Sequence, residues 1–289
     1  MTEPDTVRSF WHGAPLNPYL LLCLHSFVRQ RCRVEVFSYA PDPGFPEWIV
    51  ARDAGEIVSA KSVLVYRNGP GAGSPSLHSN LFRFALLDRL GGWWIDTDVA
   101  VLCGPLPSAP YYFAMEEDHF ANSVVKFPKG HPLLTEGTER CRRAGADVTW
   151  GVTGPTLFTN LVRHHKLAGW AVPAEQGCPF IWSDVPALFD PARTDEMVAR
   201  SGKSSFMHLC WEMWRRIGIP GDLGPPVGSF LDQQFRESDL DLRFAARIDL
   251  RYLAIWTANE KAQAKLEAYR SMVQNSRWWR LGQRLRRVC

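Results

Sequence analysis

The sequence predicts an α/β fold built on a parallel sheet. Three observations predict it: a strand–helix–strand unit near the N-terminus, a long apolar helix that runs directly into a buried strand, and two carboxylates where that strand ends. The composition agrees, because 46% of the 289 residues are hydrophobic and 22% are charged, as in folded globular chains with a substantial core.

The N-terminal part of the chain predicts one βαβ unit. Residues 7–11 form an expected short strand, residues 20–29 have the periodicity of a helix, and residues 34–39 (VEVFSY) are rich in β-forming types. Two strands joined by a helix at this spacing are typical of a parallel sheet. A further short strand is expected at 62–66, ahead of a glycine-rich turn at 69–73.

The next element is a helix expected at 79–90 (SNLFRFALLDRL), with Ser79 as its N-cap and Gly91 and Gly92 at its end. The apolar run 93–95 then predicts a buried strand, whose two tryptophans we expect in the core.

Asp96 and Asp98 follow that strand directly or lie within its bend, at the edge where open α/β sheets bind ligands. The alternation of a strand would place both carboxylates on one side and Thr97 on the other. Converging carboxylates repel each other unless a cation lies between them, so the pair indicates an oxygen-preferring divalent metal. Such a metal commonly neutralises phosphate oxygens. An acidic strand end that faces water is the alternative for a bare D-x-D.

The residues around this pair favour the metal. The stretch 79–102, SNLFRFALLDRLGGWWIDTDVAVL, resembles the signature S-[DN]-x-x-R-[YF]-x-x-L…G-G-x-x-x-D-x-D of retaining glycosyltransferases with a DXD sugar-binding region. That family includes capsule and lipopolysaccharide sugar transferases, fungal mannosyltransferases and clostridial glucosylating toxins. Further similar segments follow in the family's order, so that the resemblance spans residues 7–220: Phe10–Gly13, Asn122 with Lys129–Pro132, Thr153–Pro155, and Met207–Leu209 with Trp211 and Trp214.

The resemblance implies a GT-A fold, with a mixed, mostly parallel sheet and helices on both faces. It implies metal-dependent, retaining transfer from a nucleotide-sugar, a UDP-sugar above all, to a glycan or lipid-linked glycan acceptor, with Mn²⁺ or Mg²⁺ as the metal. It also implies roles for residues: Asp96, Asp98 and Arg83 in catalysis; Trp11 (stacked on the uracil), Asn80, Arg83, Asp96, Asn122 and Gly154 in donor binding; Asp98, Asp96 and His208 at the metal.

Some of these residues also have plainer interpretations. Asn80 stands where many relatives have Asp, which changes the charge offered to the donor sugar. Arg83 shares a helix face with Asn80, and it could instead form a surface salt bridge with Asp88. His208 could be a structural histidine, in which case Glu212 is the substitute ligand.

Other aromatic and imidazole side chains are interpreted from their neighbours in sequence. Trp211 and Trp214 are expected in the cleft, whereas Trp93 and Trp94 are expected in the core. His164 and His165 are expected on the surface, because adjacent side chains point to different sides of a regular element.

Two other classes compete with the transferase. The run 95–99 (IDTDV) also fits the nucleophile motif of aspartyl-phosphate phosphatases, although that fold expects the motif on an early strand with a later acidic pair. A catalytically inactive transferase-like module that docks on membranes is the third class.

The C-terminus differs from the rest of the chain. Residues 270–289 contain six arginines and no acid, so the remaining residues have a net charge of −3 against +3 for the whole chain. Apolar positions around Trp278 fall on one side of a helix, which suits an anionic membrane interface, with a solvated end as the alternative. We therefore expect a transferase domain at 1–255, and a helix and basic amphipathic tail at 256–289.

The cysteines, the apolar runs and the net charge indicate the compartment and the partners that we expect. The seven cysteines are scattered without a C-x-x-C pair, which fits a reducing compartment. The chain has no expected signal peptide and no apolar run long enough to span a membrane. We expect a cytoplasmic protein, peripheral at the inner membrane face through its tail, and no nucleic-acid partner at a net charge of +3.

Overall fold

The structure is a computed structural model of the 289-residue chain. It describes residues 4–59, 63–69, 71–240, 242, 244, 246–251, 253–255 and 258. The expected C-terminal helix and basic tail at 256–289 therefore lie outside the described residues, position 258 apart. No helix in the described part of the chain is both long and apolar enough to cross a membrane.

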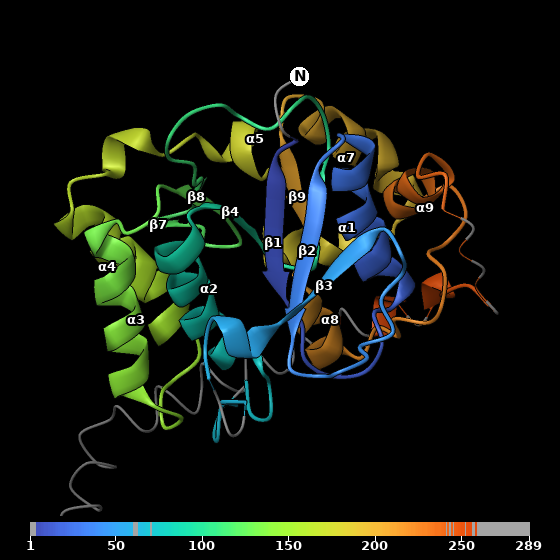
Figure 1. The fold of residues 1–289 in the computed structure, drawn as a ribbon. Coiled ribbons are helices and arrows are strands. Elements are labelled where there is room, and N and C mark those ends of the chain that lie inside the picture. The colour runs from blue at the N-terminus through green and yellow to red at the C-terminus, as the bar shows by residue number, and fades with distance from the viewer. Residues whose placement is uncertain are drawn as a thin grey trace, which may run out of the picture.

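A five-stranded sheet in the order β3–β2–β1–β4–β8 forms the centre of the fold (Figure 1). Its strands are β1 (Thr6–Phe10), β2 (Arg33–Ser38), β3 (Ile49–Asp53), β4 (Gly92–Ile95) and β8 (Val124–Phe127). β1 pairs in parallel with β2 and β4, and β2 pairs in parallel with β3. β8 runs antiparallel to β4. The expected mixed, mostly parallel sheet is confirmed.

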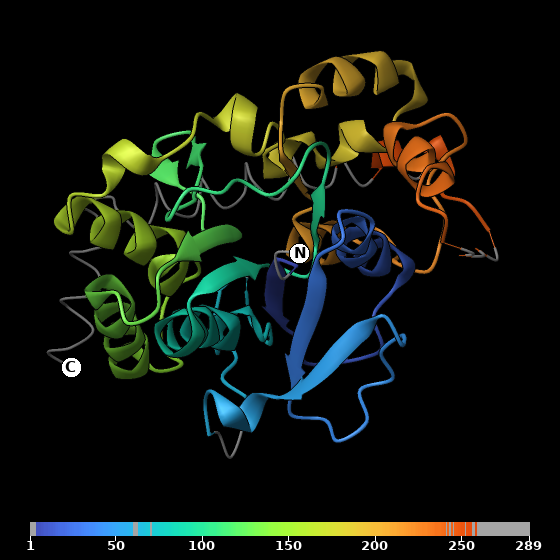
Figure 2. The same cartoon turned by 45° about the horizontal axis from the view of Figure 1, so that its top comes forward.

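Helices cover both faces of this sheet, as predicted. Because strand side chains alternate, Val36 and Trp93 pack with Leu20 of α1 (Pro18–Arg29), whereas Phe37 and Trp94 pack on the other face with α2 (Ser76–Leu90). Figures 1 and 2 show α1 on one side and α2, α3 (Pro132–Ala144) and α4 (Leu157–His164) on the other.

Smaller elements complete the described chain. Two two-stranded sheets pair β5 (Val99–Val101) with β9 (Phe206–His208), and β6 (Met115–Glu116) with β7 (His119–Phe120). A second core gathers around Tyr19 and Trp214, on the side of α1. The helices of this region are α5 (Ala174–Gly177), α6 (Val185–Leu188), α7 (Thr194–Ser201), α8 (Trp211–Ile217) and α9 (Phe230–Arg236).

Two expected elements are placed differently. The strand beside β2 is β3, at 49–53, and not the segment expected at 62–66; of that segment's described residues, only Tyr66 forms a bridge, with Ala72. The segment 49–53 is the strand beside β2 because all five of its residues pair with β2. α2 begins at Ser76, so Ser79 lies inside the helix and is not its N-cap; the hydroxyl of Ser74 accepts the N–H of Ser76 instead.

His78 fastens α2 to the chain that precedes it. Its Nδ1 accepts the N–H of Leu64 (3.3 Å), its Nε2 lies 3.0 Å from the Tyr39 hydroxyl, and that hydroxyl donates to the carbonyl of Val58 (2.7 Å). Nδ1 can accept only while the ring is neutral. Burial, with a smaller effect from His12, lowers the pKa of His78 to about 4.

Candidate active site

A cleft of about 870 Å³ opens beyond the carboxyl ends of β1 and β4. Trp11 directly follows β1 and Asp96 directly follows β4, so both lie at this edge. The cleft is lined by the start of α2, the β4–β5 turn, the β6–β7 hairpin and the segment 208–213. The position agrees with the expectation that an open α/β sheet binds ligands at this edge.

Asp96 and Asp98 lie in the tight turn between β4 and β5 and line the cleft. The N–H of Asp96 donates to the carbonyl of Ser123 (2.7 Å), and the N–H of Val99 donates to the carbonyl of Asp96 (3.1 Å). The bend of the chain, rather than strand alternation, thus brings the two carboxylates together.

The β5–β9 pairing brings His208 to Asp98. Val99 is opposite His208 in the antiparallel register, and His208 Nε2 lies 3.3 Å from Asp98 Oδ2. The same oxygen accepts the N–H of Trp211, the first residue of α8, at 2.6 Å. Ligand atoms of Asp96, Asp98 and His208 all lie within 4.8 Å of one another. Two carboxylates and one imidazole form a donor set that fits a divalent cation such as Mn²⁺.

The acid and the imidazole stabilise each other's charge. Burial by itself raises the pKa of Asp98, but His208 and the N–H of Trp211 more than offset it and leave that pKa lowered. Burial by itself lowers the pKa of His208, but Cys210 and Asp98 raise it well above its ordinary value. The two pKa values thus shift in opposite directions, as expected for an acid and a base that pair with each other.

Arg83 reaches the same turn from α2. Its side chain is only 4% exposed; Nη2 donates to Asp96 Oδ1 (2.7 Å) and Nη1 donates to Asn80 Oδ1 (3.1 Å). The guanidinium lies over the ring of Trp94, whose Nε1 donates to the same oxygen of Asp96. The alternative partner, Asp88, instead accepts from Thr135.

Two buried N–H donors at the cleft lack a partner within the described chain, Nε of Arg83 and Nδ2 of Asn122, as does the buried hydroxyl of Ser9. Buried donors are nearly always satisfied, so both N–H donors indicate a ligand with hydrogen-bond acceptors.

The other residues expected at the donor lie close by. Trp11 lines the cleft, and its Nε1 donates to the carbonyl of Ala14. Asn80 lines it too, with Nδ2 at 3.4 Å from both the Tyr66 and Thr153 hydroxyls. Gly154 is buried in the turn Val152–Thr156, and a Cβ added there would come within 3.2 Å of the Asn80 amide. Gly154 therefore lies against the side chain of Asn80.

One expected cleft residue is not there. Trp211 lines the cleft, but Trp214 is fully buried in an edge-on contact with Tyr19, at 4.7 Å between ring centroids. The two residues lie three apart on one helix, and only the first faces the cleft; the second packs in the core. Glu212 lines the cleft and accepts from the hydroxyl of Ser74 (3.2 Å). Trp93 and Trp94 are both buried, as predicted.

Sequence reasoning missed several cleft residues. Glu116, Glu117 and His119 come from the β6–β7 hairpin. Trp150 comes from a turn and Trp182 from a short 3₁₀ helix, both far along the chain. Trp182 is 43% exposed. The dense run MEEDHF at 115–120 was a signal for the hairpin residues, but nothing local to the sequence marks the two tryptophans.

Comparison with known proteins gives two findings, and no family model matches the chain. The chain is 30% identical over 87 residues to alpha-1,4-N-acetylglucosaminyltransferase from Homo sapiens; the match spans 30% of this chain and 25% of that enzyme. The solved structure of PaToxG glycosyltransferase aligns with 75% of this chain and 79% of its own at 11% identity, with a TM-score of 0.45.

Proposed function

We propose that this chain is a metal-dependent, retaining glycosyltransferase of the GT-A type that moves a sugar from a UDP-sugar to a glycan or lipid-linked glycan. The observation that carries the proposal is the convergence of Asp96, Asp98 and His208 in the cleft, beside the buried guanidinium of Arg83. The partial relative supports it, because it is named as a sugar transferase.

In this proposal Asp98 and His208 hold the metal, and Asp96 completes its ligands. Mn²⁺ or Mg²⁺ bound there would supply the charge that neutralises the diphosphate leaving group. Asp98 is fixed in place by the N–H of Trp211, and Asp96 by Arg83 and Trp94, so the carboxylates are oriented before a ligand arrives.

The nucleotide-sugar donor would bind in the cleft beside the metal ligands, along Trp11, Asn80, Arg83 and Asn122. Trp11 offers an aromatic face to the uracil. Arg83 Nε and Asn122 Nδ2 donate to oxygens of the diphosphate or the sugar, which would satisfy both unpartnered atoms. Asn80 donates or accepts a hydrogen bond at a sugar hydroxyl. Gly154, which has no side chain, allows its own backbone to lie close to the Asn80 amide.

The acceptor would enter past the aromatic side chains of the cleft. Trp150 and Trp182 line it together, and the part of Trp182 left exposed can stack against a sugar ring. We retain the basic tail at 270–289 as the segment that would attach the protein to the inner face of a membrane.

A panel of nucleotide-sugars separates the proposal from its rivals. With Mn²⁺ present, the wild-type chain should release UDP from at least one UDP-sugar, and should leave an aryl phosphate intact with Mg²⁺. Hydrolysis of the aryl phosphate alone would favour the phosphatase, for which Asp96 or Asp98 would be the nucleophile. No turnover of either, together with binding to anionic vesicles, would favour the inactive docking module.

A further inference from the structure

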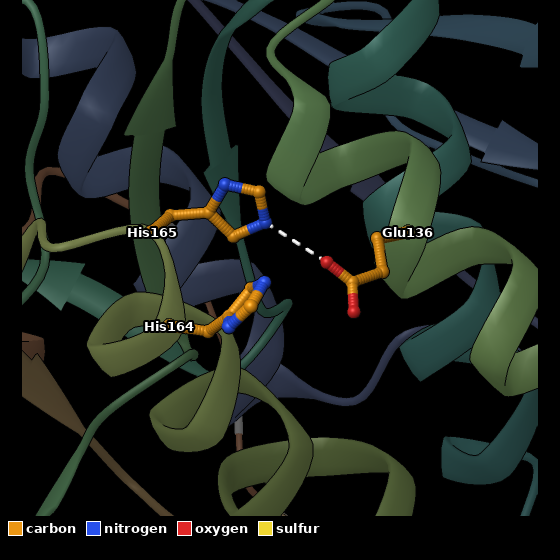
Figure 3. Close-up of side chains that lie close together, drawn as sticks. All are labelled: Glu136, His164 and His165. Atoms are coloured by element: carbon orange, nitrogen blue, oxygen red, sulfur yellow. Dashed lines mark hydrogen bonds and ion pairs between the residues drawn. The ribbon is translucent and has the colours of Figure 1, made fainter.

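A second cluster of metal-ligating side chains lies between α3 and α4, and none of its members lines the cleft (Figure 3). Glu136 comes from α3, His164 is the last residue of α4, and His165 follows it. One ligand atom from each of the three side chains lies within 4.8 Å of the other two.

Two adjacent histidines meet at the end of α4. His164 is the last residue of the helix and His165 is its C-cap, at φ −82° and ψ 7°. The two rings lie 5.1 Å apart between centroids, at 90° to each other. Both histidines are at least partly exposed, as expected, but they face one common gap opposite Glu136 (Figure 3).

Glu136 is held ready for a ligand. Its Oε1 pairs with Arg140 one helical turn on (2.5 Å), and its Oε2 lies 2.9 Å from His165 Nε2. The two bonds use different oxygens, so Arg140 fixes the carboxylate while Oε2 faces the histidines. Such an outer contact commonly orients a metal-binding carboxylate.

We propose that Glu136, His164 and His165 form a zinc-binding site. Two imidazole nitrogens and one carboxylate oxygen are the ligand types that Zn²⁺ takes, and three protein ligands leave a position for water. Hard cations such as Mg²⁺ and Ca²⁺ prefer several oxygen ligands, whereas this cluster offers a single carboxylate, which already pairs with Arg140. Imidazole ligands select zinc and its neighbours among the transition metals.

The site would act on the fold rather than on a substrate, and it does not depend on the proposed function. A bound zinc would tie α3 to the end of α4. α3 packs against α2, which carries Arg83, and α4 begins directly after the turn that holds Gly154. Zinc would therefore stiffen the helices behind one wall of the cleft.

Metal binding to the full chain tests this directly. Zn²⁺ stoichiometry and affinity are measured by titration for the wild type, for His164→Gln/His165→Gln, and for His119→Ala as the matched control. His119 also lies close to two acids, but without a second histidine beside it. Gln at position 165 can still donate to Glu136, so the variant keeps the contact between the helices. Co²⁺ in place of Zn²⁺ reports the ligand geometry through its visible absorption.

The wild type and His119→Ala should bind one more zinc per chain, at micromolar concentration or below, than His164→Gln/His165→Gln. Zinc should also raise Tm in the first two proteins by several degrees more than in the third. Repeating the titration in Asp96→Asn/Asp98→Asn should leave this extra zinc bound, since those side chains belong to the cleft. Equal zinc content in all the proteins, or binding at millimolar zinc only, would overturn the proposal.

Discussion

Arg83→Lys is the substitution that best separates a catalytic arginine from a structural one. Arg83 makes two hydrogen bonds to different residues, Asp96 and Asn80, and is almost fully buried. A lysine ammonium is a point charge on a flexible stem and cannot reproduce the planar fork that reaches both. We expect the substituted lysine to keep the contact with Asp96 and to lose that with Asn80.

The structure bounds the size of the effect. Leaving the Asn80 oxygen unsatisfied and losing one hydrogen bond costs about 1–3 kcal/mol of unfolding free energy. If Arg83 also clamps the diphosphate, turnover should fall by about 10²–10³, the loss seen when one preorganised donor is removed. The loss of stability and the loss of turnover are separable, because about 1–3 kcal/mol is less than the roughly 5–15 kcal/mol by which native domains are stable, so the variant remains folded at 25 °C.

The assay combines a thermal melt with metal-dependent UDP release at saturating UDP-sugar. The matched control is Arg67→Lys, whose partner Asp147 forms with it a surface pair in which both side chains are 66% exposed. Such a pair contributes at most about 1 kcal/mol, so this variant should behave as the wild type. Arg83→Lys with a lower Tm and undiminished turnover would show that the arginine only supports the fold, and the donor-binding role would be refuted.

Three further predictions follow from named side chains. Trp11→Ala should weaken UDP binding by about 1–3 kcal/mol, the contribution of an aromatic–base stack, while Trp170→Ala, a solvent-exposed tryptophan outside the cleft, should not; equal affinities by calorimetry would contradict the stacking. His78 has a pKa of about 4 in the folded chain and 6.5 in the unfolded chain, so proton binding favours the unfolded chain. In denaturant melts, the free energy of unfolding should therefore fall by about 2 kcal/mol from pH 7 to pH 5. A loss of the same size in His78→Gln would exclude His78 as the cause. Removal of residues 270–289 should abolish salt-sensitive co-sedimentation with anionic vesicles and leave UDP release intact; pelleting of both forms, or of neither, would exclude the tail as an anchor.

The sequence alone was sufficient wherever a feature depends on neighbouring residues. The βαβ unit, the α2–β4 junction at Gly91 and the D-x-D at a strand end are all local patterns of this kind. Gly91 shows why: it ends α2 at a φ of 66°, and a Cβ there would meet the backbone of Lys129 at 2.5 Å.

Features that depend on pairing between distant segments were not predictable in the same way. His208 was placed at the metal by resemblance alone, and it is the antiparallel β5–β9 register that sets its distance to Asp98. The third strand was misplaced because a short alternating run such as IVARD carries a weak signal until β2 is there to pair with it. The meeting of Glu136 with His164 and His165 likewise depends on how α4 ends and how α3 packs beside it.

The metal site at Asp98 is tested by UDP release from a UDP-sugar, with Mn²⁺ titrated into the wild type and into Asp98→Asn. The Asn side chain lacks the negative charge of the Asp98 carboxylate, which we propose binds the metal and which lies beside His208 and the N–H of Trp211. We predict Mn²⁺-dependent release by the wild type and a rate at least about 10²-fold lower for Asp98→Asn at every Mn²⁺ concentration, equivalent to about 3 kcal/mol. Release that needs no divalent metal, or equal rates for both proteins at saturating Mn²⁺, would contradict it.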